Sequence, residues 1–153
     1  MISLPTTEQI LLDCSRELIE TVAPAVFDPA VKLCVEMMDN VLRNAATRCA
    51  HEIAWMTDET EAMLSFAADV ASTCPTPDLS AALMAAGEGR RRSLELAEVA
   101  REYSLAGEAL SCAIEAAFDG NNDVFLRQAV AILESRNSRE QEIKGDWAMI
   151  GRG

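Results

Sequence analysis

The feature that most constrains the fold is a run of apolar residues at alternating spacings of three and four between positions 96 and 117. This spacing keeps the side chains on one side of an α-helix, because one helical turn takes 3.6 residues. A helix with such a seam packs along another long helix. The seam consists of Leu96, Val99, Tyr103, Ala106, Leu110, Ala113 and Ala117.

Helical periodicity also covers most of the remaining chain, and the ends of the helices carry recognisable caps. Thr6 and Gln9 have the spacing of a capping box, and Asp28 before Pro29 suits the start of a second helix. We expect the loop at 73–78, "TCPTPD", and the "GEG" at 87–89 to interrupt the helices, and Gly120 to follow the end of one. The expected helices span about 7–22, 29–72 (unbroken, or restarting near 57–58), 77–86, 90–118, and from 121 or 122 to 135 or 144.

Strand patterns are weak, since alternating Val, Ile and Thr runs are missing and Ala, Leu, Glu and Arg dominate. The sequence therefore predicts an all-α protein, an antiparallel bundle of three or four long helices plus a short one. We expect a single domain over residues 1–144 and an extended C-terminal tail over 145–153.

Composition limits the classes of partner. Lys and Arg total 13 against 25 Asp and Glu, a formal charge of −12, which argues against nucleic acid and anionic lipid and permits a partner with a basic face. The five cysteines are odd in number and have no CxxC spacing, which indicates reduced core cysteines in a cytoplasmic protein. The N-terminus does not resemble a signal peptide, and no apolar run approaches the ~20 residues of a membrane span.

The stretch "CAHEIAWM" at 49–56 contains the only histidine, His51, next to Glu52. Adjacent helical residues point about 100° apart, so these two do not form a catalytic dyad. When the helix is projected along its axis, His51 falls off the apolar stripe. Arg48 and Trp55 fall between the side that carries His51 and the side that faces the core. Glu52, by contrast, projects into the apolar stripe.

A carboxylate among apolar residues must be paired, neutralised or directed at a partner. We therefore expect Glu52 to be well buried and bonded to Arg48, one turn earlier, or to a donor from another helix. The functional alternative is a carboxylate presented to another protein or a ligand. A third interpretation, an enzyme with Glu52 as general acid or base, lacks a nucleophile–base constellation, so no catalytic residue is assigned.

Other candidate sites are weaker. One histidine without Glu-x-x-His or CxxC spacing excludes the usual helical metal centres, and no cofactor is expected. "GEGRRR" at 87–92 would place Arg90, Arg91 and Arg92 at a helix start, where a weak anion site is conceivable. Trp147 lies in an apolar tail, "DWAMI", that either folds back on the bundle or docks on another chain.

Two stretches carry a family resemblance: "TEQILLDCSRELIETVAPAV" and "VEMMDNVLRNAATRCAHEIAWM". Over about the first 60 residues they resemble small all-helical bacterial proteins of unassigned domain function. Genes of this family usually accompany a kinase of the aminoglycoside-phosphotransferase type and often an acyl-CoA dehydrogenase. The resemblance carries no catalytic motif.

The resemblance implies that this chain is a non-catalytic accessory subunit of such a kinase. The kinase itself would act on a hydroxyacyl-CoA, as in levulinate catabolism. Arg48, His51, Glu52 and Trp55 are then candidates for one interaction patch, and Trp147 for another. The alternative is a self-associating structural or binding module, a homodimer that pairs through the seam of residues 96–117 without a kinase.

Overall fold

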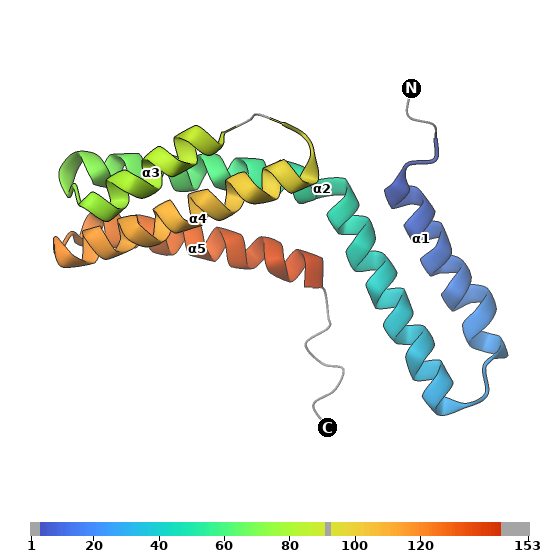
Figure 1. Cartoon of the computed structure of the whole chain (residues 1–153). Coiled ribbons are helices and arrows are strands. Elements are labelled where there is room, and N and C mark those ends of the chain that lie inside the picture. The colour runs from blue at the N-terminus through green and yellow to red at the C-terminus, as the bar shows by residue number, and fades with distance from the viewer. Residues whose placement is uncertain (1–3, 91–92, 145–153) are drawn as a thin grey trace. The chain divides into compact units, whose positions relative to one another are not determined.

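The computed structural model describes residues 4–90 and 93–144, which form α-helices and contain no strand. The predicted all-α class is confirmed for this part of the chain. Contacts divide the chain into two compact units, the first with residues 1–52 and 139–153, the second with residues 53–138 (Figure 1). We call the described residues 4–52 the hairpin, and the second unit the bundle.

The hairpin begins with α1 (Thr7–Glu17), followed by a π-helical turn, η1 (Leu18–Val22), and a 3₁₀ turn, η2 (Ala23–Ala25). The capping box is confirmed: the Thr6 N–H donates to Gln9 Oε1 at 2.8 Å, and the Gln9 N–H donates to Thr6 Oγ1 at 3.2 Å. Without these two bonds, the backbone N–H groups of Thr6 and Gln9 would have no partner within the helix, because the first N–H groups of a helix lack a carbonyl one turn earlier.

Helix α2 (Pro29–Thr73) is unbroken over 45 residues, so the uninterrupted alternative is the correct one. Asp28 caps its start as predicted, since Asp28 Oδ1 accepts the N–H groups of Ala30 and Val31 at 2.8 and 3.3 Å. The helix ends at the proline-containing loop, because the residue before a proline is driven out of the helical region.

Helix α3 (Pro77–Gly89) continues through "GEG", so the expectation of a break at 87–89 is wrong. The glycine at 89 serves a close helix contact instead. A Cβ on Gly89 would lie 2.5 Å from Leu105 Cδ1, and Arg101 Nη2 donates to Gly89 O at 2.8 Å. The approach of α3 to the next helix, and not helix termination, explains why glycine stands there.

Helix α4 (Leu96–Asp119) starts six residues later than predicted. Ser93 Oγ accepts the Glu95 N–H at 3.0 Å, a local turn that competes with helix formation. At the other end Gly120 is the C-cap in a helical conformation, and Asn121 takes the left-handed position at φ 50°. Gly120 thus follows the end of the helix as expected, but the next position, C′, is taken by Asn121, and asparagine tolerates the left-handed conformation.

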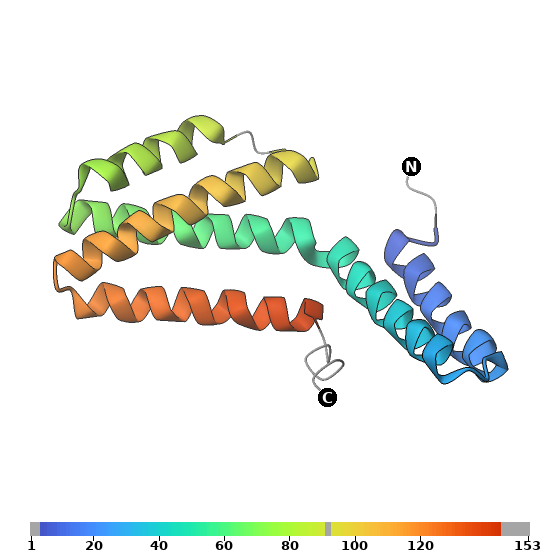
Figure 2. The same ribbon diagram turned by 60° about the horizontal axis from the view of Figure 1, so that its bottom comes forward.

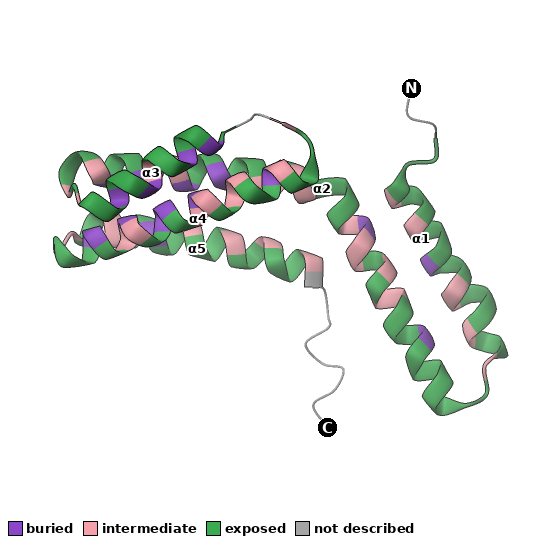
Figure 3. Ribbon diagram, in the orientation of Figure 1, coloured by how far each residue is buried: buried purple, intermediate pink, exposed green. Residues whose placement is uncertain are grey.

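Helix α5 (Asp123–Lys144) follows, and Asn122 Oδ1 accepts the Phe125 N–H at its start, at 3.3 Å. In the bundle, the second part of α2 lies with α3, α4 and α5 (Figure 2). The core gathers where these helices face one another, shown as buried positions in Figure 3. Its members are Met63, Phe66, Ala67, Val70, Leu79, Ala82, Ala106, Ala109, Leu110, Ala113, Ala116, Ala117 and Ala129.

The predicted seam of α4 is largely confirmed as the core-facing side of that helix. Val99, Ala106, Leu110, Ala113 and Ala117 are buried within this chain, whereas Leu96 at its start is exposed. The many alanines allow the helices to approach closely. Because the chain itself covers the seam, a second copy cannot pair through it unless the bundle opens.

We expect Gly89→Ala to destabilise the protein by about 1 kcal/mol, because the new Cβ overlaps Leu105 Cδ1 and this half-buried side chain has to turn aside. Gly87→Ala is the matched control, since nothing lies within 4 Å of its added Cβ. There the better helix propensity of alanine should stabilise the protein by up to ~1 kcal/mol. Urea unfolding measures both, and equal effects would contradict the close contact.

Candidate functional site

The hairpin has very little core of its own. Its buried residues are Ser15, Val35 and Ala46. Ser15 Oγ donates a short hydrogen bond to Asp39, linking α1 to α2, and Arg43 Nε donates to the other Asp39 oxygen at 2.9 Å. The two helices are thus held by one small polar contact and a few apolar ones.

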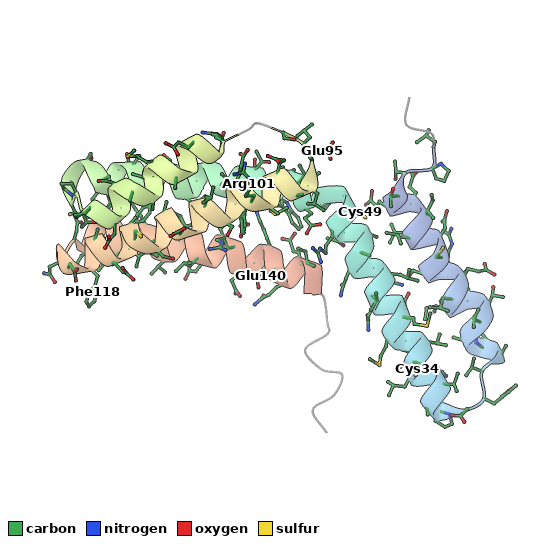
Figure 4. The ribbon with its side chains drawn as sticks, in the orientation of Figure 1. Cys34, Cys49, Glu95, Arg101, Phe118 and Glu140 are labelled. Carbon is green, nitrogen blue, oxygen red and sulfur yellow. The ribbon has the colours of Figure 1, made fainter. Side chains whose placement is uncertain are left out.

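One side of α2 in the hairpin is apolar and exposed. Val31, Met38 and Val41 expose 49, 56 and 54% of their surface, and Cys34 is exposed as well. We call Val31, Cys34, Met38, Val41 and Ala45 the apolar stripe (Cys34 is labelled in Figure 4). Next to it, apolar atoms line a groove of about 420 Å³ formed by Cys34, Met37, Met38, Val41 and Leu42. Large exposed apolar patches of this kind mark interaction sites.

The charged residues of the same stretch of α2 are spaced to fall away from the stripe. Lys32, Glu36, Asp39 and Arg43 follow one another at intervals of four, three and four, which places them on the opposite side of the helix. The Asp39–Arg43 ion pair lies on this side. The hairpin therefore has a charged side and an apolar side.

The predicted bond between Arg48 and Glu52 is confirmed. Arg48 Nε donates to Glu52 Oε1 at 3.1 Å, and Arg48 Nη2 makes a second, shorter bond to the same oxygen. The pair raises the pKa of the Arg48 guanidinium, through the hydrogen bond and charge of Glu52. The Glu52 side chain is 22% exposed, which makes it a rim residue and corrects the expectation that it is well buried.

Two further candidates, His51 and Trp55, also lie on α2. His51 is exposed and Trp55 is half-buried, and both have partners within the chain. Trp55 belongs to the bundle by the division of the chain, whereas Arg48, His51 and Glu52 belong to the hairpin unit. Trp147 and the tail of residues 145–153 lie outside the described residues.

Arg90 stands at the end of α3 and not at a helix start, so the geometry expected of an anion site is absent there. Its Nη2 forms an ion pair with Glu61 Oε1 at 2.5 Å. The pair borders a pocket of about 220 Å³ whose wall also includes Thr57, Ser93 and Glu102. Arg91 and Arg92 lie outside the described residues.

The cysteines are all free thiols, but none is buried. Cys14, Cys34 and Cys49, all in the hairpin, are exposed, and Cys74 and Cys112 are half-buried. Cys74 and Cys112 pack against the bundle core. The expectation of core cysteines is therefore wrong for the three hairpin cysteines, which the chain leaves exposed. Burial raises the pKa of the Cys112 thiol.

The bundle contains a polar network that sequence reasoning missed. Tyr103 OH donates to Glu59 Oε2 at 2.7 Å, and Arg136 Nε lies 3.1 Å from the same hydroxyl and 3.4 Å from Glu59 Oε2. The guanidinium carbon also lies 5.3 Å from the centre of the tyrosine ring. The network joins α2, α4 and α5, and the Glu59 side chain is only 11% exposed.

The heptad spacing of α2 could have revealed Glu59, which stands seven residues after Glu52 and therefore on the same side of the helix. Burial and the hydrogen bond to Glu59 raise the pKa of Tyr103, and Arg136 opposes the rise. The three side chains are bonded to one another and hold three helices together. We call Glu59, Tyr103 and Arg136 the junction.

Within residues 4–90 and 93–144, no group of three or more His, Cys, Asp or Glu side chains is arranged to hold a metal ion. None of the described helices combines the length and the apolar character needed to cross a bilayer. Comparison with protein-family models, with curated proteins and with solved structures finds no match.

Removing Arg136 should strongly destabilise the bundle. Arg136→Ala removes the guanidinium that lies 3.4 Å from the largely buried Glu59 carboxylate, and the loss of one partner of a buried pair costs about 3–5 kcal/mol. Arg16→Ala is the control, since both members of the Arg16–Asp13 pair are more than half exposed and such pairs contribute at most ~1 kcal/mol. Chemical denaturation compares the two, and a small effect for Arg136→Ala would refute the junction.

Tyr103 is the only tyrosine in the chain, so its ionisation can be followed by tyrosinate absorbance. We expect its pKa in the folded protein to lie above the ordinary value of 10.0. A raised folded-state pKa means that the neutral phenol stabilises the fold below pH ~10, and that this contribution is lost as the pH rises through the folded value.

Glu59→Gln should lower the pKa of Tyr103 relative to the native chain, because it removes the carboxylate that accepts the phenolic hydrogen. Tyr103→Phe should weaken the loss of stability at alkaline pH. A midpoint at or below 10.0 in the folded native chain would show that the phenol is not held as described.

Proposed function

We propose that this chain is a non-catalytic interaction subunit, which binds a partner protein through the exposed apolar side of the hairpin. The observation that supports it most directly is the stripe itself, in which Val31, Met38 and Val41 are each about half exposed. Covering such side chains stabilises a complex, because each buried Val or Met contributes roughly 1.5–3 kcal/mol.

The partner suggested by the family resemblance is an aminoglycoside-phosphotransferase-like kinase, acting on a hydroxyacyl-CoA or a related acid. The resembling residues, 7–26 and 35–56, include α1 and the later part of the apolar stripe, Met38, Val41 and Ala45. The Arg48–Glu52 ion pair continues the stripe, because Arg48 stands three positions after Ala45 and Glu52 four positions after Arg48. The pair therefore forms a polar boundary at one end of the stripe. His51 is exposed beside it.

A non-catalytic role is further supported by the state of the titratable groups in the bundle. Glu59, Tyr103 and Arg136 are bonded to one another, and Glu61 is paired with Arg90. Groups engaged in this way would have to break existing bonds before they could transfer protons to a substrate.

The second candidate function is a homodimer formed through the same side of the hairpin. Two such hairpins, packed with their apolar sides together, would make a four-helix arrangement with two-fold symmetry. The seam of α4 does not serve this purpose, because Ala106, Leu110 and Ala113 are buried in the chain's own core. The charge of −12 on each copy opposes self-association.

Co-expression with an aminoglycoside-phosphotransferase-like kinase tests the proposal. We expect the two proteins to co-purify, and light scattering to give the mass of a complex containing both. A kinase that is soluble and fully active alone, and forms no complex with this chain, would overturn the proposal. A dimer of this chain that forms regardless of the kinase would favour the second candidate.

A further inference from the structure

The apolar stripe has the spacing of a surface that packs along a helix. Val31, Cys34, Met38, Val41 and Ala45 alternate at intervals of three and four, as in the seam of a coiled coil. From Val31 to Ala45, 14 steps along α2, the stripe is about 21 Å long, at 1.5 Å per step. A helix of some four turns can lie along it.

The hairpin offers a second wall for such a helix. On α1, Ile10 and Cys14 are exposed one turn apart. The two helices run antiparallel (Figure 1), and the Ser15–Asp39 bond fixes which sides face each other. Helical projection from this contact places Ile10 and Cys14 on the same side of the hairpin as the stripe.

The groove is suited to side chains that vary in shape. Met37 and Met38 contribute two of its five lining residues, and methionine adapts to irregular neighbours because it is unbranched and flexible. The stripe itself carries no charged residue. The part of the occupant that enters the groove is therefore apolar and uncharged.

The hairpin as a whole is acidic. Residues 4–52 contain eight Asp and Glu against four Lys and Arg, a difference of −4, and three of these four cations are paired with carboxylates of the hairpin. On α1, Glu17 follows Ile10 and Cys14 at the helical spacing of four and three, which places a carboxylate at the edge of the apolar side.

From these features we infer that the apolar side of the hairpin receives a single amphipathic helix of the partner protein, with an uncharged apolar seam and Lys or Arg along its flank. This inference rests on the proposed function for the existence of a partner, and it adds the form and charge of the docking element. Such a helix buries the stripe and Ile10 together and completes a three-helix bundle with α1 and α2.

A second copy of the hairpin fits less well. It would bring Glu17 and the same acidic surroundings to both sides of the contact, and like charges facing each other oppose association. An anionic membrane surface is disfavoured for the same reason.

A photo-reactive amino acid at position 38 of the full chain, in complex with the kinase, tests the inference. We expect Met38 replaced in this way to cross-link to one kinase segment, whose mapped sequence has apolar residues at spacings of three and four and basic residues beside them. The same group at Glu36, on the charged side of α2, is the matched control and should not cross-link to the kinase.

Charge reversal supplies an independent measurement. Glu17→Lys should weaken the complex by about 3- to 10-fold at low salt, with a smaller effect at high salt, because it opposes a basic flank. Glu36→Lys makes the same change of charge on the opposite side and should alter the affinity less than ~2-fold. Equal effects would mean that only the net charge of the chain matters.

The native thiols report the same event without substitution. Cys34 should be labelled rapidly in the free chain, where it is exposed, and be protected in the complex. Cys112, half-buried in the bundle, should keep its own slower rate in both states. Unchanged labelling of Cys34 in a formed complex would contradict docking on the stripe.

The outcomes separate the two proposals. If position 38 cross-links to a kinase segment without apolar spacing and basic flanks, the inference fails and the proposed function stands. If the complex forms but position 38 cross-links to no kinase segment, the partner binds elsewhere, and both the inference and the proposed docking surface are overturned. If position 38 cross-links to a second copy of this chain, the occupant is a copy and the inference is overturned. If no complex with the kinase forms at all, both proposals fall.

Discussion

The bundle depends on a buried charge that has to be neutralised locally. Glu59 stands on α2 among residues that form the core, and its carboxylate is held by a phenol from α4 and a guanidinium from α5. Removing one partner from a carboxylate in such a position strongly destabilises a fold. Three helices from distant parts of the sequence must therefore adopt one relative placement before the charge is satisfied, which gives the bundle specificity that an alanine-rich core alone would lack.

Around this junction the core is made from small side chains and a few large ones. The α4 face is mostly alanine, and larger buried groups come from α2 and α3, among them Met63, Val70 and Leu79. Phe66 of α2 also meets Phe125 of α5 edge to face, with ring centres 6.1 Å apart. Small residues on one helix and aromatic ones on its neighbours let the helices pack at close range without voids. The glycine at position 89 extends the same principle to the contact between α3 and α4.

Much of the fold could be predicted from the sequence, because helix periodicity and caps are local properties. The capping box at Thr6, the cap at Asp28 and the seam of α4 all follow from residues within a few positions of one another. The role of Gly89 could not be predicted, because glycine is favoured there by the close approach of Leu105, which lies 16 positions away on another helix. The candidate site shows the same limit. The pairing of Arg48 with Glu52 is a one-turn interaction, whereas the exposure of the cysteines depends on which faces the chain covers.

Because the hairpin has a small core, it is the part of the molecule that unfolds locally first. Local stability follows the number of buried apolar contacts, and the hairpin buries only Val35, Ala46 and Ser15, against the thirteen core members of the bundle. Backbone amides of α1 and the first turns of α2 should then exchange with solvent long before those of α4. For the same reason proteases would cut the hairpin first. Molecules of this protein whose apolar stripe is not covered by a partner would then be degraded while their bundle is still folded.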